Sequence, residues 1–358
     1  MTAPSSSFIK TILVLLLVFT CLHFAKDFLI PIVIGGVLAT FFSPFCEWME
    51  RKRVSRALAA LISILILLLF ITGILTLIGW QIAELTKDFE FIKSRTVEIF
   101  DHIQEYIFNH YGVTMETQSQ FIKEERSSFT WILSNIAASF ASTVTIFILT
   151  LVYIFSLLYY RSHIKTFLLK LSPSTERAEM EKIIYRVANV SQQYMVGLAK
   201  MIGCLWIMYF IGFSIVGLKN ALFFAILCGV LEIVPFIGNI TGTTITALVA
   251  AMQGAHPSMI LGVLGTYGIV QFIQGWILEP LILGPQVKIN PLFTIIALVL
   301  GEMIWGIPGI FLAIPLMAMI KIIFDHIEPL KPYGFLIGEI ETKKTKSTFI
   351  KKVNKWYK

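Results

Sequence analysis

Residues 57–83 read ALAALISILILLLFITGILTLIGWQIA and contain no charged side chain. A helix needs about 20 mostly apolar residues to cross the hydrocarbon core of a bilayer, and this run is longer than that. A helix also satisfies its backbone N–H and C=O groups internally, which a water-free environment requires. The stretch therefore predicts a transmembrane helix.

The composition of the whole chain agrees with this reading. Hydrophobic residues make up 56% of the sequence and charged residues 14%, whereas soluble domains carry roughly 45–50% and about 25%. Further apolar runs cover residues 11–25, 28–46, 129–160, 201–218, 220–252, 257–280 and 289–320, and the last three each contain a single glutamate as their charged residue. The sequence predicts an all-α polytopic membrane protein of about eight transmembrane segments, with Pro/Gly-broken helices in its C-terminal half. The first two runs are either a tight hairpin or a tilted helix followed by a re-entrant piece.

The distribution of charge predicts the orientation. Basic residues outnumber acidic ones in residues 47–56, 161–200 and 321–358, whereas residues 84–130 hold nine acidic and five basic residues. Cytoplasmic loops carry an excess of Lys and Arg. We therefore expect a multi-pass protein with both termini in the cytoplasm. The net charge of +7 is then explained by the basic segments that are predicted to be cytoplasmic, and it implies no nucleic-acid partner.

The same patterns divide the chain into six parts. They are N-terminal segments 1–3 at 1–83, an extracytoplasmic amphipathic segment at 84–130, segment 4 at 131–160, a basic cytoplasmic helical segment at 161–200, a transport core with segments 5–8 at 201–324, and a basic cytoplasmic tail at 325–358. Apolar residues recur every three or four positions in 84–110, which predicts an amphipathic helix. The tail either contacts the inner leaflet or is solvated.

Sequence motifs of catalysis are absent. The chain contains no GxxxxGK[ST] phosphate-binding loop and no HExxH metal motif. Its six histidines form no i,i+4 pair, and its four cysteines lie in or beside apolar runs without a CxxC pair. We expect a protein that is not an enzyme and that needs no cofactor or metal.

Three isolated carboxylates mark the C-terminal half. Between Lys219 and Lys321 the charged residues are Glu232, Glu279, Lys288 and Glu302, and no arginine follows Arg186. A charge at the bilayer centre costs several kcal/mol, by contested estimates of about 2.5 to 17. An unpaired carboxylate there can take up a proton or a cation, which is the chemistry that ion-coupled transport needs. The three glutamates are therefore predicted coupling residues; the alternative is that they cap half-helices or bond across the bundle.

Two of these carboxylates precede helix-breaking residues. Residues 232–239 read EIVPFIGN and residues 301–309 read GEMIWGIPG. The predicted break positions are Pro235, Gly238, Gly306, Pro308 and Gly309, because proline lacks a backbone donor and glycine frees the backbone. Interrupted segments in corresponding positions point to a transporter site. Identical residues occur 70 positions apart at 220/290, 222/292, 223/293, 226/296, 232/302 and 237/307. With the predicted topology this favours a parallel duplication, unless either segment is a re-entrant hairpin.

Uncharged amides accompany the carboxylates. Gln271 and Gln274 are one turn apart on one helix face, and Asn239 and Asn290 lie near the two broken regions. We expect these four residues to contact a polar solute, because amides coordinate one without a buried charge. For Gln271 and Gln274 the alternative role is hydrogen bonding between helices.

The C-terminal motifs resemble those of the AI-2E transporter family, whose members include the autoinducer-2 exporter. The residues that carry the resemblance are Glu232-x-x-Pro235-x-x-Gly238, Gln271-x-x-Gln274-x-x-x-x-Glu279-Pro280-x-x-x-Gly284, Asn290-Pro291 and Gly306-x-x-Gly309-x-x-x-x-x-Pro315. The resemblance implies a bacterial inner-membrane exporter or ion-coupled carrier that forms a homo-oligomer, a pentamer being one candidate. Gln274 stands where the family often has an acidic residue, and Asn290 stands where it often has His. Because Gln and Asn do not titrate, a proton-relay role is then expected of Glu232 and Glu302 instead.

Three functional hypotheses follow. The first is a secondary exporter of a small polar metabolite similar to autoinducer-2, driven by H⁺ or Na⁺ and in contact with membrane lipid. The second is a sodium/proton antiporter. The third is an oligomeric channel or a non-transporting membrane scaffold that uses residues 84–130 to hold partners.

Overall fold

Helices provide the regular structure of the described residues, with one isolated β-bridge between Ile289 and Gly338. The computed structural model describes residues 4–87, 108–109, 115–235 and 237–339. In chain order the helices are α1 (Pro4–Phe24), α2 (Lys26–Arg51), α3 (Arg56–Lys87), α5 (Met115–Leu171), α6 (Arg177–Val216), α7 (Ala221–Leu231), α8 (Ile237–Met252), α9 (Pro257–Ile273), the π-helix η1 (Gln274–Leu283), α10 (Gly284–Val287), α11 (Pro291–Trp305), α12 (Ile307–His326), the 3₁₀ turn η2 (Glu328–Leu330) and α13 (Lys331–Ile337).

The predicted fold class is confirmed. Among the described residues, six helices are long and apolar enough to cross a membrane, and two shorter apolar helices, α7 and α11, accompany them. Large apolar side chains such as Leu69, Phe70 and Trp80 are exposed along α3, as expected for a helix that faces lipid. The chain is an all-α membrane protein. Most of the predicted amphipathic helix at 84–110 and the tail Lys343–Lys358 lie outside the described residues.

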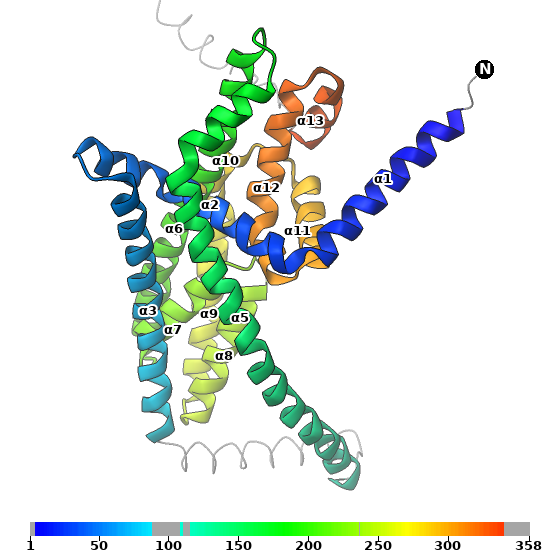
Figure 1. Cartoon of the computed structure of the whole chain (residues 1–358). Coiled ribbons are helices and arrows are strands. Elements are labelled where there is room, and N and C mark those ends of the chain that lie inside the picture. Colours follow the sequence, from blue (N-terminus) through cyan, green and yellow to red (C-terminus); the bar gives the residue numbers. More distant parts are fainter. Residues whose placement is uncertain (1–3, 88–107, 110–114, 236, 340–358) are drawn as a thin grey trace, which may run out of the picture.

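The first two apolar runs form two diverging helices rather than a hairpin. Helices α1 and α2 meet at Ala25, and α1 then leaves the rest of the bundle (Figure 1). Apolar side chains of this helix such as Leu13, Leu17 and Phe19 are exposed. Trp305, at the end of α11, donates a hydrogen bond of 3.0 Å from Nε1 to the Leu22 carbonyl oxygen. This bond joins α1 to the C-terminal half of the chain.

The main core surrounds α6. Leu205, Tyr209 and Phe213 of this helix are fully buried and pack with residues of α7, α9 and α12. A second core joins α2, α3 and α5, around Ile154 and Leu158. Helix α6 contacts both the N-terminal and the C-terminal helices, so it connects the two halves of the bundle.

The two broken segments are helical hairpins. In the first, α7 and α8 fold back so that Gly242 lies against Cys228 and Gly238 lies against Leu231. In the second, α11 and α12 fold back at Gly306, whose φ is +63°, and the backbones of Gly301 and Gly309 approach closely. Both 220–252 and 289–320 are therefore interrupted at the predicted break residues.

The two hairpins enter the bundle from opposite ends (Figure 1). At one end, His326 at the end of α12 contacts Arg186 near the start of α6. From the other end, α7 returns along α6, and Trp206 Nε1 donates to the Ile226 carbonyl oxygen over 3.2 Å. The exception stated for the parallel duplication applies, because each segment turns back at its break and the two hairpins run in opposite directions.

Candidate functional site

Glu232 lies at the turn of the first hairpin. It follows the last residue of α7, and its side chain is only 4% exposed. The chain continues in tight turns, with Val234 N–H donating to the Leu231 carbonyl and Gly238 N–H to the Val234 carbonyl. Pro235 has no N–H to extend the helix, and a Cβ at position 238 would collide with the Leu231 carbonyl. The break therefore holds a carboxylate inside the protein.

Side-chain amides surround this carboxylate. Gln274 Nε2 donates to Glu232 Oε1 over 2.9 Å, and Gln271 Nε2 donates to Gln274 Oε1 over 3.3 Å. Asn239 Nδ2 donates to Gln271 Oε1 over 2.8 Å, and Gln271 Nε2 also lies 3.2 Å from the hydroxyl of Tyr209. Residues of α6, α8, α9 and the π-helix thus form one hydrogen-bonded network around Glu232.

The network leaves oxygen atoms without partners. Glu232 Oε2, Asn239 Oδ1 and Thr243 Oγ1 are buried and make no hydrogen bond in the part of the chain that the structure describes. Within that part, no Lys or Arg forms an ion pair with Glu232 either. A buried polar atom without a partner costs about 1–3 kcal/mol, and more when it is charged. The site is therefore incomplete as a purely structural network.

The other two predicted coupling carboxylates lie elsewhere. Glu279 is exposed on the π-helix, although it is close enough to Glu232 for the two charges to interact. Glu302 is exposed on α11, in the second hairpin. The structure therefore brings Glu232, Asn239, Gln271 and Gln274 together and leaves Glu302 outside this cluster.

Asn290 has a complete set of hydrogen bonds of its own. Its Oδ1 accepts the Phe293 N–H over 2.9 Å and so caps α11. Its Nδ2 donates to the carbonyl oxygens of Leu336, over 2.7 Å, and of Gly338, over 3.2 Å. These bonds tie the start of α11 to α13. In the described residues the Asn290 side chain therefore has a structural role, whereas its contact with solute stays a prediction.

The remaining predicted break residues form the turn of the second hairpin. Gly306 adopts a positive φ that favours glycine. Pro308 follows in the first turn of α12, where its missing N–H disturbs no helical bond. Gly309 faces Gly301 across the hairpin without room for a Cβ. The backbones of α11 and α12 are therefore in close contact beside this turn.

Two residues of the site were missed by sequence reasoning. Tyr209 is fully buried in α6 and reaches Gln271, yet a tyrosine in an apolar run carries no distinctive signal. Thr243 lies four residues after Asn239 on α8, so that both side chains share one face of the helix. That spacing of two polar residues in an apolar helix is the signal that could have identified it.

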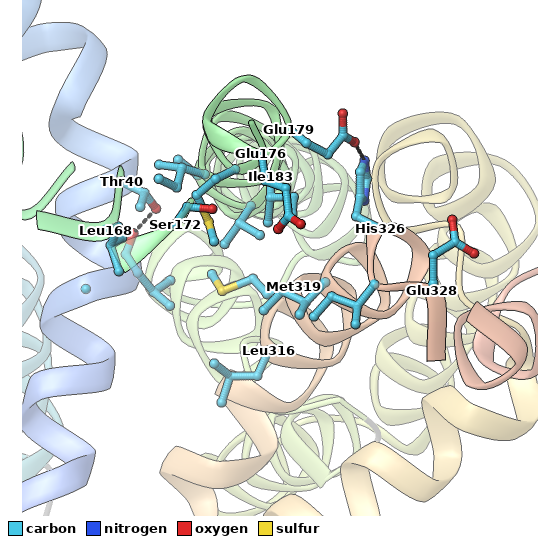
Figure 2. A pocket seen from close by; sticks show the side chains of 18 of the residues that line it. Thr40, Leu168, Ser172, Glu176, Glu179, Ile183, Leu316, Met319, His326 and Glu328 are labelled. Atoms are coloured by element: carbon cyan, nitrogen blue, oxygen red, sulfur yellow. Dashed lines mark hydrogen bonds and ion pairs between the residues drawn. The ribbon is translucent and has the colours of Figure 1, made fainter. Parts of the chain in front are cut away.

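A separate cavity lies near the end of α12 (Figure 2). It has a volume of about 1070 Å³ and lies between α2, α5, α6 and α12. Apolar side chains such as Ile183, Leu316 and Met319 line it, and Glu176, Glu179 and Glu328 lie at its margin. Glu179 pairs with His326 at 3.8 Å. None of the residues that bond to Glu232 lines this cavity.

The arrangement at Glu232 defines the class of protein. A buried carboxylate without a basic partner among the described residues, held at a broken helix within an apolar bundle, is the kind of site that membrane transporters use for ions and polar solutes. In the described residues, no three His, Cys, Asp or Glu side chains gather as a metal site would require.

Comparisons with known proteins agree. The model of the AI-2E family transporter matches residues 12–328, so the chain belongs to the AI-2E transporter family. It is 27% identical to the putative transport protein YueF of Bacillus subtilis, over 85% of each chain. It is 22% identical to the AI-2 transport protein TqsA of Escherichia coli, over 87% of this chain and 90% of that one. It is also 23% identical to a sodium-lithium/proton antiporter of Halobacillus andaensis, over 81% of this chain and 87% of that one.

Proposed function

We propose that this protein is a secondary transporter that exports a small polar metabolite of the autoinducer-2 kind, coupled to H⁺ or Na⁺ at Glu232. The observation that carries the proposal is the burial of Glu232 among amides, with Oε2 lacking a partner in the described residues. A group in this state gains stability when it takes up a proton or cation. A transporter can use that uptake to couple ion flow to solute movement.

The other polar residues have supporting roles in this proposal. Gln271, Gln274 and Asn239 contact the solute or hold the carboxylate in place. Glu279, which is exposed and near Glu232, passes the coupling ion between the surface and the buried site. Glu302 ranks below both carboxylates because its side chain is exposed on another hairpin.

The experiment is solute accumulation in proteoliposomes. Under an imposed H⁺ or Na⁺ gradient, the native protein accumulates solute against its concentration gradient, and Glu232→Gln reduces accumulation to that of protein-free liposomes. Glu181→Gln is the matched control, because Glu181 is exposed and pairs with Lys165 away from the site. Normal accumulation by Glu232→Gln would end the assignment.

A second candidate function is sodium/proton antiport, in which the ion itself is the cargo. The name of the Halobacillus andaensis relative supports it. A pH-sensitive dye inside the liposomes distinguishes the two functions: antiport gives Na⁺-dependent proton movement without added metabolite. Neither signal is expected from a channel or scaffold, the third alternative, which would show no gradient-driven accumulation.

We also propose a placement in the bacterial inner membrane with both termini in the cytoplasm. The support is the excess of basic residues at 47–56, 161–200 and 321–358. Membership of the AI-2E family also supports assembly as a homo-oligomer. Accessibility of single introduced cysteines at 53 and 331 to an impermeant thiol reagent, in intact and in opened cells, tests the orientation.

A further inference from the structure

We propose that Glu232, Asn239 and Thr243 form a binding site for a dehydrated monovalent alkali cation. This inference rests on the proposed function in taking Glu232 as the coupling carboxylate, but it names the ligands and the class of ion. Its basis is the set of three buried oxygen atoms that have no hydrogen-bond partner in the described residues: Glu232 Oε2, Asn239 Oδ1 and Thr243 Oγ1.

The three residues lie close together along the first hairpin, Glu232 at the end of α7 and the other two in the first turns of α8. Asn239 and Thr243 are one turn apart on α8, so their side chains project from the same face. Asn239 lies within interaction range of the Glu232 carboxylate and bonds to Gln271, which bonds to Gln274 and through it reaches Glu232. Helix α8 packs on both α7 and α9. The hairpin thus carries one buried carboxylate and two buried neutral oxygens without partners on neighbouring turns, and we infer that a bound cation brings them together.

The chemistry of the oxygens selects the ion. Carboxylate, amide carbonyl and hydroxyl oxygens are hard ligands, which bind alkali and alkaline-earth ions. One carboxylate neutralises one positive charge, so a monovalent cation leaves the buried site neutral. Ca²⁺ takes six to eight oxygen ligands, usually from several carboxylates, and Glu279 is exposed outside the set. The charge count therefore favours a monovalent cation.

The amide network supports the same role. Gln274 Nε2 donates to Glu232 Oε1 over 2.9 Å, so Oε2 is the carboxylate oxygen that remains available for an ion. Gln271 receives the Asn239 N–H, which leaves Asn239 Oδ1 as that residue's free acceptor. Fixed partners of this kind orient the ligands of an ion before it binds.

The test is cation-dependent thermal unfolding of the purified full-length protein in lipid nanodiscs, at one alkaline pH and constant ionic strength. We expect NaCl or LiCl to raise the unfolding midpoint in a saturable way and choline chloride to leave it unchanged, because a ligand that binds only the folded state stabilises it. Glu232→Gln removes the response. Equal midpoints in all three salts would overturn the inference; Glu232 Oε2 would then be completed by a proton.

Two threonines on α8 provide a matched pair of variants. Thr243→Val removes an unpartnered hydroxyl with almost no change in shape, and we expect the Na⁺ concentration for half-maximal stabilisation to rise roughly tenfold, as for loss of one contact to a charge. Thr246→Val is the control, because the Thr246 hydroxyl already donates to the Gly242 carbonyl over 2.7 Å. An equal effect of both variants would remove Thr243 from the ligand set.

Failure of this inference differs from failure of the proposed function. If Na⁺ and Li⁺ do not stabilise the protein but Glu232-dependent, proton-driven accumulation persists, the cation site is wrong and the transporter assignment stands. If cations bind but no accumulation or proton movement occurs in liposomes, the cation site stands and the transporter assignment is wrong.

Discussion

The side-chain amide of Gln274 and the carboxylate of Glu232 are joined by a buried hydrogen bond of 2.9 Å. Gln274 is the first residue of the π-helix and Glu232 follows the end of α7. This single contact connects a helix that crosses the bundle to the turn of a hairpin. Substitutions at this contact can therefore distinguish a role of Glu232 in transport from a role in packing alone.

Replacing Gln274 by Leu should destabilise the protein and impair transport. The substitution leaves Glu232 Oε1 buried without its partner, which costs about 1–3 kcal/mol. Thermal unfolding in nanodiscs measures the loss. Gln253→Leu, near the end of α8, is the control, because its side chain makes no hydrogen bond to the residues that the structure describes. If both variants unfold at the same temperature, the bond to Glu232 has no net effect on stability.

Glu302→Gln should leave transport within about twofold of the native rate, as expected for an exposed substitution. Its side chain is exposed on α11, where burial does not force it to take up an ion. Initial rates of solute uptake in proteoliposomes check this, with Glu232→Gln measured in the same preparation. A loss as complete as that of Glu232→Gln would show that the second hairpin takes part directly in coupling.

Gly309→Ala should destabilise the second hairpin by roughly 1–3 kcal/mol, the usual cost of overpacking. A Cβ at position 309 would meet the backbone of Gly301, and backbone cannot move aside as a flexible side chain can. Gly268→Ala is the matched control, because a Cβ there meets nothing within 4 Å. Chemical or thermal unfolding should separate the two alanine variants; equal stability would contradict the close approach of α11 and α12.

Trp305→Phe should loosen α1 without disrupting the core. The variant keeps an aromatic ring but loses the hydrogen bond to the Leu22 carbonyl, a loss of about 1 kcal/mol. Hydrogen exchange of amides near the C-terminal end of α1 should then accelerate by about fivefold, the equivalent of that free energy. Trp276→Phe, at an exposed position of the π-helix, serves as the control. Unchanged exchange would show that other contacts hold α1.

The sequence predicts the membrane class because hydropathy depends only on composition within a run. It also predicts that Glu232 is noteworthy, since an isolated charge in apolar sequence needs compensation. Asn239, Gln271 and Gln274 do meet at Glu232, and the sequence marks Asn239 by its place beside a break and the two glutamines by their spacing of one helical turn. These predictions depend on the types of neighbouring residues and on their spacing, both of which a single sequence provides.

The direction of the chain after each break could not be predicted in the same way. Pro235 and Gly306 interrupt a helix, but whether the chain continues across the membrane or turns back depends on contacts such as Gly301 with Gly309. The exposure of Glu302 has the same origin, because tertiary packing decides which face of α11 is covered. Tyr209 joins the site only because α6 passes beside α9.

The bond between Trp305 and Leu22 has a mechanical consequence. Trp305 ends α11 at the tip of the second hairpin, and Leu22 lies just before the corner at Ala25 where α1 diverges from the bundle. Any displacement of that tip would therefore act on the C-terminal end of α1. The rest of α1, whose described apolar side chains are largely exposed, would follow as one helix, so that this bond links the position of the second hairpin to the position of α1.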